Sequence, residues 1–594
     1  MRVGVRENLS VSDSLLRLWN HMTPHRRRQF ILLLFLVIVA SFAEVVSIGS
    51  VVPFLGALTN PGKIFSNEMV RPFINFLGID SPAEIVILLT TVFCFLALLS
   101  GSIRLILLKF STRLSFATGA DLSVSIYEKT LYQPYMVHIN RNTSEIINGI
   151  STKANAIIYS VILPVLTLVS TSFMLLAIIS TLIYVNPFLC LVASAVFGCI
   201  YIVIAKRTKA KKIKNSHVIA DKSTKIIKSL QEGLGGIRDV LIDGTQKAYL
   251  RDYTSADSAL REAQANNQFV GQSPRYIMES LGMILIAVLA LYLFNQNEGL
   301  SGAIPVLGII ALGAQRLLPV MQQAYNALSS IQGSYRSLHD ALELLDQPMP
   351  DYASTSEIKL DFNKCIQLNN VDFQYQATLN RVISNLNLSI VKGDRIGIIG
   401  STGSGKSTLI DLLMGLLEPT SGNLIVDEKI VNQQNVRAWQ KHIAHVPQTI
   451  FLADTSIAEN IAFGIDFENI DWDRVRESAE KAQLSDVITS LPQGYDTLVG
   501  ERGIRLSGGQ RQRIGIARAL YKDADVIIFD EATSALDNQT EDFVMQAIEG
   551  LGQEITVIMI AHRLTTLKKC TKIIELVDGQ VVNIGTYRDI TDHS

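Results

Sequence analysis

The sequence predicts a bundle of membrane-spanning α-helices followed by a soluble α/β domain. Charged residues make up only 18% of its 594 residues, below the roughly 25% of an average soluble protein, and the mean hydropathy is +0.28. Long apolar runs dominate the chain up to residue 325, whereas after residue 345 short apolar strands alternate with more polar segments. This composition excludes a mostly disordered chain and argues against a purely soluble one.

The overall charge and the cysteines exclude several further classes of protein. The net charge of −1 provides no overall basic field, so we predict no nucleic-acid partner. The five cysteines form no closely spaced pairs, and therefore predict neither a disulfide framework nor a zinc or redox motif.

Six segments of the first part are long enough to cross a bilayer, which takes about 20 apolar residues each. They are approximately residues 30–58, 83–110, 155–185, 187–206, 276–295 and 300–325. Arg26, Arg27 and Arg28 precede the first span, and the segment 206–251 is rich in Lys and Arg. Positive residues favour the cytoplasmic side, so we expect the N-terminus and the C-terminal domain to be cytoplasmic. The alternative is that the basic segment 206–251 binds nucleic acid. Membrane topology already accounts for its positive charge, so we do not favour this alternative.

The two segments between spans on the cytoplasmic side, 111–154 and 207–275, are too long for simple turns. Both hold few helix breakers, so we expect each to be a helical hairpin that continues out of the membrane. The expected reversals are Gln133-Pro134 and Asp243-Gly244, where a helix breaker occurs. The alternative is that these segments lie as amphipathic helices on the membrane surface.

A phosphate-binding loop is the strongest local motif of the second part. It follows an apolar strand at 395–399, opens a helix at 409–416, and comprises Gly400, Ser401, Thr402, Gly403, Ser404, Gly405, Lys406 and Ser407. The glycines let backbone N–H groups turn toward phosphates, and the helix N-terminus adds positive potential. We expect Lys406 to contact the β- and γ-phosphates and Ser407 to hold Mg²⁺.

Two carboxylates follow the apolar strand 526–529. Such residues at the carboxyl end of a strand lie where an open α/β sheet binds its ligands. We expect Asp530 to support Mg²⁺ and Glu531 to act as the general base for the attacking water.

A third motif lies between these two, and its residues are Leu506, Ser507, Gly508, Gly509 and Gln510. Together with 400–407 and 526–531 it resembles the nucleotide-binding domain of ATP-binding cassette (ABC) transporters, over about residues 345–594. The resemblance implies that Tyr375 stacks on adenine, that Gln448 senses Mg²⁺ and the γ-phosphate, and that His562 is the switch histidine. It also places Asp537 in the D-loop and Thr408 beside the nucleotide.

The same resemblance implies a dimer. In the family, Ser507 and Gly509 contact the γ-phosphate of ATP held by Lys406 of the other subunit. Both the catalytic and the signature motifs are intact, so we predict a homodimer with two composite sites for ATP and Mg²⁺; a heterodimer is the alternative.

Six spans fused N-terminal to this domain resemble the ABC exporter architecture with two coupling helices, which we expect near residues 128–140 and 243–252. The predicted organisation is therefore a cytoplasmic N-terminal segment, 1–29, a six-helix transmembrane domain, 30–340, and an ABC nucleotide-binding domain, 341–594.

Two features bear on the cargo. Arg104, Arg275 and Arg316 lie in or beside the predicted spans, where charges are costly and mark functional sites. We expect them to hold an anionic group such as a pyrophosphate; the alternative is snorkelling or pairing with Glu44 or Glu279. In the outer loop, one helical face predicts an external amphipathic helix near 69–78 that contacts lipid or packs on the bundle, through Val70, Phe73, Ile74 and Leu77.

The membrane half also resembles one branch of the exporters, the PglK-type flippases of lipid-linked oligosaccharides. The resemblance is carried by the segments 42–44, 53–55, 133–135 and 138–145 and by the helical outer loop. It implies an ATP-driven flippase of the bacterial inner membrane that moves an anionic lipid-linked glycan from the cytoplasmic to the outer leaflet. The alternatives are a multidrug or simple lipid exporter and, from another class, an ATP-gated channel.

Overall fold

The computed structural model describes residues 10–59, 61–65, 81–185, 187–295, 299–353, 359–376, 380–531, 541, 545–546, 548, 550, 552–561 and 564–591. The chain divides into two compact units. Unit 1 comprises Met1–Leu131 and Arg141–Pro348, and unit 2 comprises Tyr132–Asn140 and Met349–Ser594.

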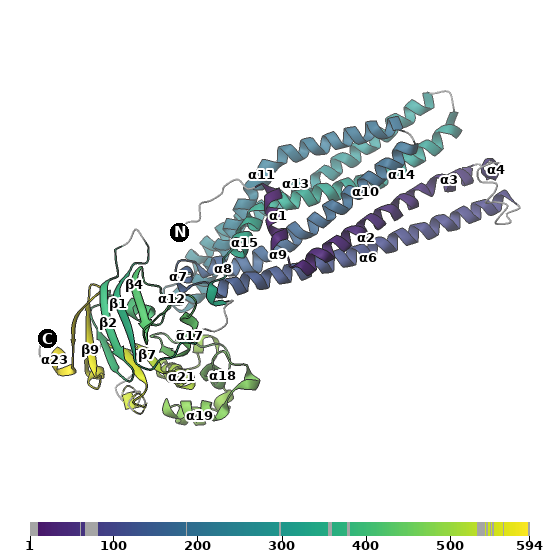
Figure 1. Cartoon of the computed structure of the whole chain (residues 1–594). Coiled ribbons are helices and arrows are strands. Elements are labelled where there is room, and N and C mark those ends of the chain that lie inside the picture. Colours follow the sequence, from purple (N-terminus) through teal and green to yellow (C-terminus); the bar gives the residue numbers. More distant parts are fainter. Residues whose placement is uncertain are drawn as a thin grey trace. The chain divides into compact units, whose positions relative to one another are not determined.

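Unit 1 is entirely helical in its described residues (Figure 1). Its elements are α1 (Val11–His21), α2 (Pro24–Gly49), α3 (Val51–Thr59), α4 (Pro61–Phe65), α6 (Pro82–Leu131), α8 (Thr143–Asn148), η1 (Gly149–Lys153), α9 (Ala154–Ile157), η2 (Ile158–Ile162), α10 (Leu163–Val185), α11 (Pro187–Gly235), α12 (Ile237–Ile242), α13 (Gln246–Asn295), α14 (Gly299–Gly333) and α15 (Tyr335–Leu345). The elements η1 and η2 are π-helical.

The long helices of unit 1 lie side by side, α2 with α6 and α10, and α13 with α11 and α14 (Figure 1). α6 and α13 each contain 50 residues. At 1.5 Å per residue such a helix is about 75 Å long, more than twice the roughly 30 Å of a bilayer's hydrocarbon core. α6 and α13 are therefore each one continuous helix that is long enough to extend beyond the membrane, as expected.

Three of the six predicted spans stand out in the structure by length and apolar composition. The spans 30–58 and 83–110 lie within the helical stretches Pro24–Leu58 and Pro82–Leu131, and the span 155–185 overlaps the stretch Thr143–Ser180. The other three predicted spans fall within α11, α13 and α14. The proposed external helix near 69–78, with Val70, Phe73, Ile74 and Leu77, lies outside the described residues.

Both predicted chain reversals lie where the structure turns the chain. At the first, α6 ends at Leu131 and the short helix α7 (Tyr135–Ile139) begins directly after Pro134. At the second, a turn at residues 243–245 joins α12 (Ile237–Ile242) to α13, and Gly244 has φ of +63°. A further break at Gly236, about two turns before Asp243, separates α12 from α11. The coupling helix near 243–252 stays a prediction, and the short helix closest to it is α12.

Unit 2 is built on two β-sheets. The antiparallel sheet has the order β2-β1-β4-β5, from β1 (Cys365–Phe373), β2 (Ile383–Val391), β4 (Ser421–Val426) and β5 (Lys429–Ile430). The second sheet has the order β10-β9-β3-β8-β7-β6, from β3 (Arg395–Ile399), β6 (Ile443–Val446), β7 (Val526–Asp530), β8 (Thr556–Ile560), β9 (Lys572–Val577) and β10 (Gln580–Gly585). All of its pairings are parallel except β9 with β10.

The helices and helical turns of unit 2 connect these strands. They are α7, η3 (Asp351–Ala353), α16 (Lys406–Leu413), α17 (Val436–Lys441), α18 (Ile457–Ile461), η4 (Phe467–Asn469), α19 (Trp472–Lys481), α20 (Ser485–Ser490), η5 (Gly494–Asp496), η6 (Glu501–Gly503), α21 (Gly508–Tyr521), η7 (Leu564–Leu567) and α23 (Tyr587–Thr591).

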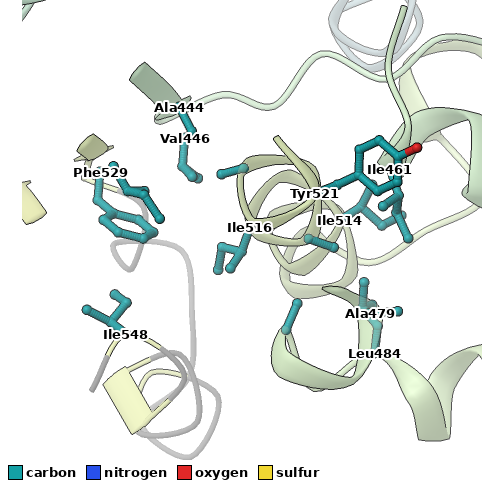
Figure 2. Packing of buried hydrophobic residues seen from close by; sticks show 14 of the residues in the cluster. Ala444, Val446, Ile461, Ala479, Leu484, Ile514, Ile516, Tyr521, Phe529 and Ile548 are labelled. Atoms are coloured by element: carbon teal, nitrogen blue, oxygen red, sulfur yellow. The ribbon is translucent and has the colours of Figure 1, made fainter. Parts of the chain in front are cut away.

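The parallel sheet is buried on both faces, which explains why its strands are continuous apolar runs. Val526 and Ile528 of β7 point to the core shared with the antiparallel sheet and α16. Ile527 and Phe529 point to the opposite core, formed with α18, α19 and α21 (Figure 2). Burial on both faces holds the ends of these strands rigidly, and the site described next lies at those ends.

Candidate functional site

The sheet topology brings the carboxyl ends of four neighbouring strands together on one side of unit 2. β3, β8, β7 and β6 are neighbours and run parallel, so their carboxyl ends meet at the same edge. The phosphate loop follows β3, Asp530 ends β7, and Gln448 comes two residues after β6. Motifs up to about 130 residues apart in the sequence therefore form one site.

The phosphate loop depends on backbone conformations that only glycine adopts without strain. Gly400 has φ of +151°, and a Cβ there would lie 2.2 Å from the carbonyl oxygen of Leu576. Gly405, with φ of +101°, is the N-cap residue of α16. The loop thus wraps tightly against the N-terminus of a helix, where backbone N–H groups and the helix dipole favour an anion.

Lys406 lies in the first turn of α16 and is 8% exposed. Its ammonium group donates hydrogen bonds to the carbonyl oxygens of Gly400 and Ser401, each at 2.8 Å. The side chain therefore folds back over the loop, with its charge at the point where the sequence predicts bound phosphates. Ser407 and Thr408 follow in the same helical turn.

Tyr375 follows β1 closely in the sequence and lies beside this helix. Its hydroxyl is 3.0 Å from the hydroxyl of Thr408, and its ring packs edge-on to Phe373 with centroids 5.0 Å apart. The hydrogen bond places an aromatic ring beside α16, and stacking of this ring on adenine stays a prediction.

Gln448 and Glu531 are in direct contact. Gln448 Nε2 donates a 2.6 Å hydrogen bond to the Glu531 carboxylate. Glu531 has φ of +50°, a left-handed conformation that costs a residue with a side chain of order 1–3 kcal/mol and persists mainly at functional sites. The strained backbone sets the carboxylate beside Gln448, where a general base for water is expected.

Negative charge accumulates in this part of the site. Burial raises the pKa of Asp530, the charge of Glu531 raises it further, and Lys406 opposes the shift. Burial and the charge of Asp530 also raise the pKa of Asp411 to about 6. Asp411 could not be predicted from the sequence, because a lone carboxylate five residues after Lys406 belongs to no motif.

This set of donors fits a hard divalent cation. Mg²⁺ prefers carboxylate, hydroxyl and phosphate oxygens, and a cation would relieve the repulsion that raises the pKa of Asp530. Ser407, Gln448 and Asp530 are the residues that would hold Mg²⁺ together with the nucleotide. When bound, Mg²⁺ neutralises charge on the β- and γ-phosphates.

The third motif forms the start of α21. Ser507 is the N-cap residue, and its hydroxyl accepts a hydrogen bond from the backbone N–H of Gln510, at 3.2 Å. The Gln510 side chain accepts one in return from the backbone N–H of Ser507, at 2.8 Å. This reciprocal capping box fixes the exposed helix start at Ser507 and Gly508. The N-terminus of a 14-residue helix therefore presents N–H groups to solvent.

Several predicted residues are placed otherwise or are not described. Asp537 and His562 lie outside the described residues. Arg104 Nη1 is 3.5 Å from Glu44, and Arg275 Nε is 2.7 Å from Glu279. Both arginines thus pair with carboxylates, the alternative named for them above. Arg316 lies in α14, but its side chain is outside the described part.

Comparison with known proteins follows the same division of the chain. The family profile described as "ABC transporter transmembrane region" matches residues 29–310, and that described as "ABC transporter" matches residues 383–534. The chain is 29% identical to an "ATP-dependent lipid A-core flippase" of Ralstonia nicotianae over 481 residues, 80% of each chain. It is 26% identical to a protein of the same name from Cupriavidus metallidurans over 478 residues, 79% of each chain.

A solved structure agrees with the fold. The structure of a bacterial Atm1-family ABC exporter with ATP bound matches with a TM-score of 0.78 over 96% of each chain, at 21% sequence identity. The predicted fold class, a helical transmembrane region fused to a nucleotide-binding domain, is confirmed. The chain belongs to the ABC transporters of exporter type, as a half-transporter whose transmembrane region is fused to an ATP-hydrolysing domain.

Proposed function

We propose that this protein is a flippase of the bacterial inner membrane that moves an anionic lipid-linked glycan from the cytoplasmic to the outer leaflet. Its N-terminus and nucleotide-binding domain are cytoplasmic, and ATP with Mg²⁺ drives the transport. The observation that supports a lipid cargo is sequence similarity to proteins named lipid A-core flippases. The similarity extends over about four fifths of both chains. The intact site in unit 2 supports the use of ATP.

In this proposal two copies of the chain form the working transporter. The exposed start of α21 at Ser507 and Gly508 is a helix N-terminus suited to an anion. In a homodimer it meets the γ-phosphate of the ATP that the partner's phosphate loop holds. Each composite site then takes Lys406 and Glu531 from one copy and the signature residues from the other.

The two short helices support such an assembly. α7 belongs to unit 2 of its own chain, where Met136 packs against the core beside the antiparallel sheet. α12 carries exposed apolar side chains, with Leu241 61% and Ile242 72% exposed. Exposed apolar clusters of this kind mark interaction surfaces. We assign the partner's nucleotide-binding domain as the surface that covers α12, so that α7 and α12 are the two coupling helices.

The anionic part of the cargo is assigned to Arg104 and Arg316. Arg104 Nη1 lies 3.5 Å from Glu44, and the Arg104 side chain is 44% exposed. A guanidinium has five N–H donors, so it can contact Glu44 and an anion together. Arg275 contributes less in this proposal, since Glu279 holds its Nε at 2.7 Å.

ATPase measurements in lipid nanodiscs test the cargo. We expect a polyprenyl-pyrophosphate oligosaccharide to stimulate the wild-type protein and to stimulate Arg316→Ala much less, because the variant lacks an anion contact. Arg261→Ala is the matched control, since Arg261 is exposed and pairs with Asp257 at 3.2 Å on α13, before the predicted span. If this lipid does not change the ATPase activity of the wild-type protein, the assignment as an exporter still holds. The cargo is then another lipid or a drug, and the proposed glycan cargo is contradicted.

Loss of the signature cap tests the dimer. Ser507→Ala removes the α21 cap, which costs about 1 kcal/mol of stability, and in the composite site it also removes a phosphate contact. Ser456→Ala is the matched control, because Ser456 forms the same kind of capping box with Glu459 on α18. We expect similar losses of thermal stability in both variants but a large loss of ATPase activity only in Ser507→Ala. Equal activity in the two variants contradicts a role for Ser507 at the partner's ATP.

A further inference from the structure

Unit 1 contains a cavity of about 690 Å³ that the proposed function does not yet use. Its volume lies within the roughly 300–1,000 Å³ of typical ligand sites. Four stretches of chain line it: the segment from η1 to α10, the middle of α11, α13, and the part of α14 and α15 between residues 323 and 337. By the predicted spans, it lies near the cytoplasmic ends of the transmembrane helices.

Amides and hydroxyls make up the polar part of the lining. The amide side chains are those of Gln264, Asn267, Gln268, Gln272, Gln323 and Asn326. Gln264, Gln268 and Gln272 are spaced four residues apart, so they form a row along one face of α13. Hydroxyl groups come from the other three stretches of chain, among them Thr152 and Ser223.

Charged groups are scarce in the lining of the cavity. Lys153 is the single charged residue in that lining. Its Nζ lies 2.6 Å from the Asp340 carboxylate, which also pairs with Arg336 Nε at 2.9 Å. Because Lys153 is already held by a carboxylate, the other lining residues offer hydrogen bonds rather than a counter-charge for an anion.

A second layer of hydrogen bonds holds two of the amides in place. Asn215 donates to the side chain of Asn267 at 2.9 Å. Buried Gln322 donates to the side chain of Asn326 at 2.9 Å and to the carbonyl oxygen of Gly271 at 3.0 Å. Binding groups fixed in this way lose little conformational entropy when a ligand arrives.

The backbone on one side of the cavity is irregular. η1 and η2 are two five-residue π-helical segments, a conformation that is rare and often occurs at functional sites. They deliver Thr152 and Lys153, and Tyr159 and Ser160, to the cavity lining. Close packing supports η2, since a Cβ on Gly119 would lie 2.1 Å from Ile158 Cγ1.

We infer that this cavity binds the uncharged, hydroxyl-rich sugar portion of the cargo, an inference that rests on the proposed function. Every sugar hydroxyl is both donor and acceptor, and each amide or hydroxyl of the lining can supply the complementary group. The apolar part of the lining, with Leu163, Pro164 and Ile219, can contact the carbon-bound faces of sugar rings, and a pyrophosphate finds no cation among the lining residues other than the paired Lys153. The cavity therefore recognises the sugar, while the anionic group lies elsewhere.

Two probes with the same lipid tail separate these contributions. The first is a farnesyl glycoside of a disaccharide, which has sugar but no phosphate, and the second is farnesyl pyrophosphate, which has no sugar. Binding of each is measured with the full-length protein in nanodiscs. We expect Gln268→Leu and, independently, Gln272→Leu to bind the glycoside about tenfold more weakly than the wild type, as the loss of one or two hydrogen bonds predicts. Farnesyl pyrophosphate should bind these variants as it binds the wild type.

Asn266→Leu is the matched control, because Asn266 lies on the opposite face of α13 from the glutamine row and does not line the cavity. Unchanged glycoside binding in both glutamine variants overturns the inference, as does an equal loss for both probes or an equal loss in Asn266→Leu. A wild-type protein that binds the glycoside as expected but is not stimulated by the polyprenyl-pyrophosphate oligosaccharide contradicts the proposed function alone.

Discussion

Glu531→Gln is expected to lower ATP hydrolysis at least about 100-fold, within the range that general-base catalysis contributes, while MgATP binding persists. The carboxylate lies at the carboxyl end of β7, on a strained backbone with φ of +50°, and accepts a 2.6 Å hydrogen bond from Gln448. Glutamine preserves the shape and can still accept that bond. It cannot take a proton from water, so the variant should bind ATP but should not hydrolyse it at an appreciable rate.

Steady-state ATPase activity and equilibrium binding of a fluorescent ATP analogue test this expectation. Glu477→Gln is the control with the same change of atoms, since Glu477 is on α19 and pairs with Lys481 at 2.7 Å. The control should retain full activity. Turnover near the wild-type rate in Glu531→Gln shows that another group activates the water and contradicts the assignment of Glu531 as the base.

Lys406→Met is expected to weaken ATP binding about 100-fold, the equivalent of a lost charge-assisted hydrogen bond of about 3 kcal/mol. Methionine keeps much of the length but has no charge and no donor. The substitution also leaves the carbonyl oxygens of Gly400 and Ser401 without the donor that bridges them at 2.8 Å. The loop then loses both its attraction for phosphates and the contact that orders it.

Titration with the fluorescent ATP analogue measures this loss, and hydrolysis should fall with it. Lys429→Met is the control, because Lys429 is exposed on β5 of the antiparallel sheet. Wild-type affinity in Lys406→Met contradicts the placement of the β- and γ-phosphates at this lysine. A similar loss in Lys429→Met points instead to a general destabilisation of unit 2.

The segments of the nucleotide site could be found in the sequence because each is a contiguous motif. The phosphate loop follows from the spacing of Gly400 to Ser407, whereas the role of Ser507 to Gln510 follows from the resemblance to ABC transporters. The structure gives a loop with left-handed glycines and a capped helix start at Ser507, and the roles of these residues stay predictions. Asp411 escaped prediction because its raised pKa comes from burial and from the charge of Asp530. The residues next to Asp411 in the sequence show neither that it is buried nor that Asp530, 119 positions away, lies near it.

The membrane half shows the opposite balance. Hydropathy placed the spans, and the Gln133-Pro134 break was found because proline ends a helix locally. The position of α12 was missed, since two helix-breaking sites, at Gly236 and Gly244, compete in one segment. The arginines were chosen for their cost in a membrane, and the sequence offered Glu44 and Glu279 as possible partners. Packing of neighbouring helices decided that Arg104 pairs with Glu44, and the i, i+4 spacing on α13 allows Arg275 to pair with Glu279.

The sequence by itself determined the class of protein and its use of ATP, because these follow from composition and from short motifs. Only the tertiary structure decided that Gln268, Asn326 and Ser223 line one cavity and that Lys153 pairs there with Asp340. Such a site takes several side chains from each of several helices separated by up to about 190 residues. Its recognition chemistry therefore exists only once the helices pack together.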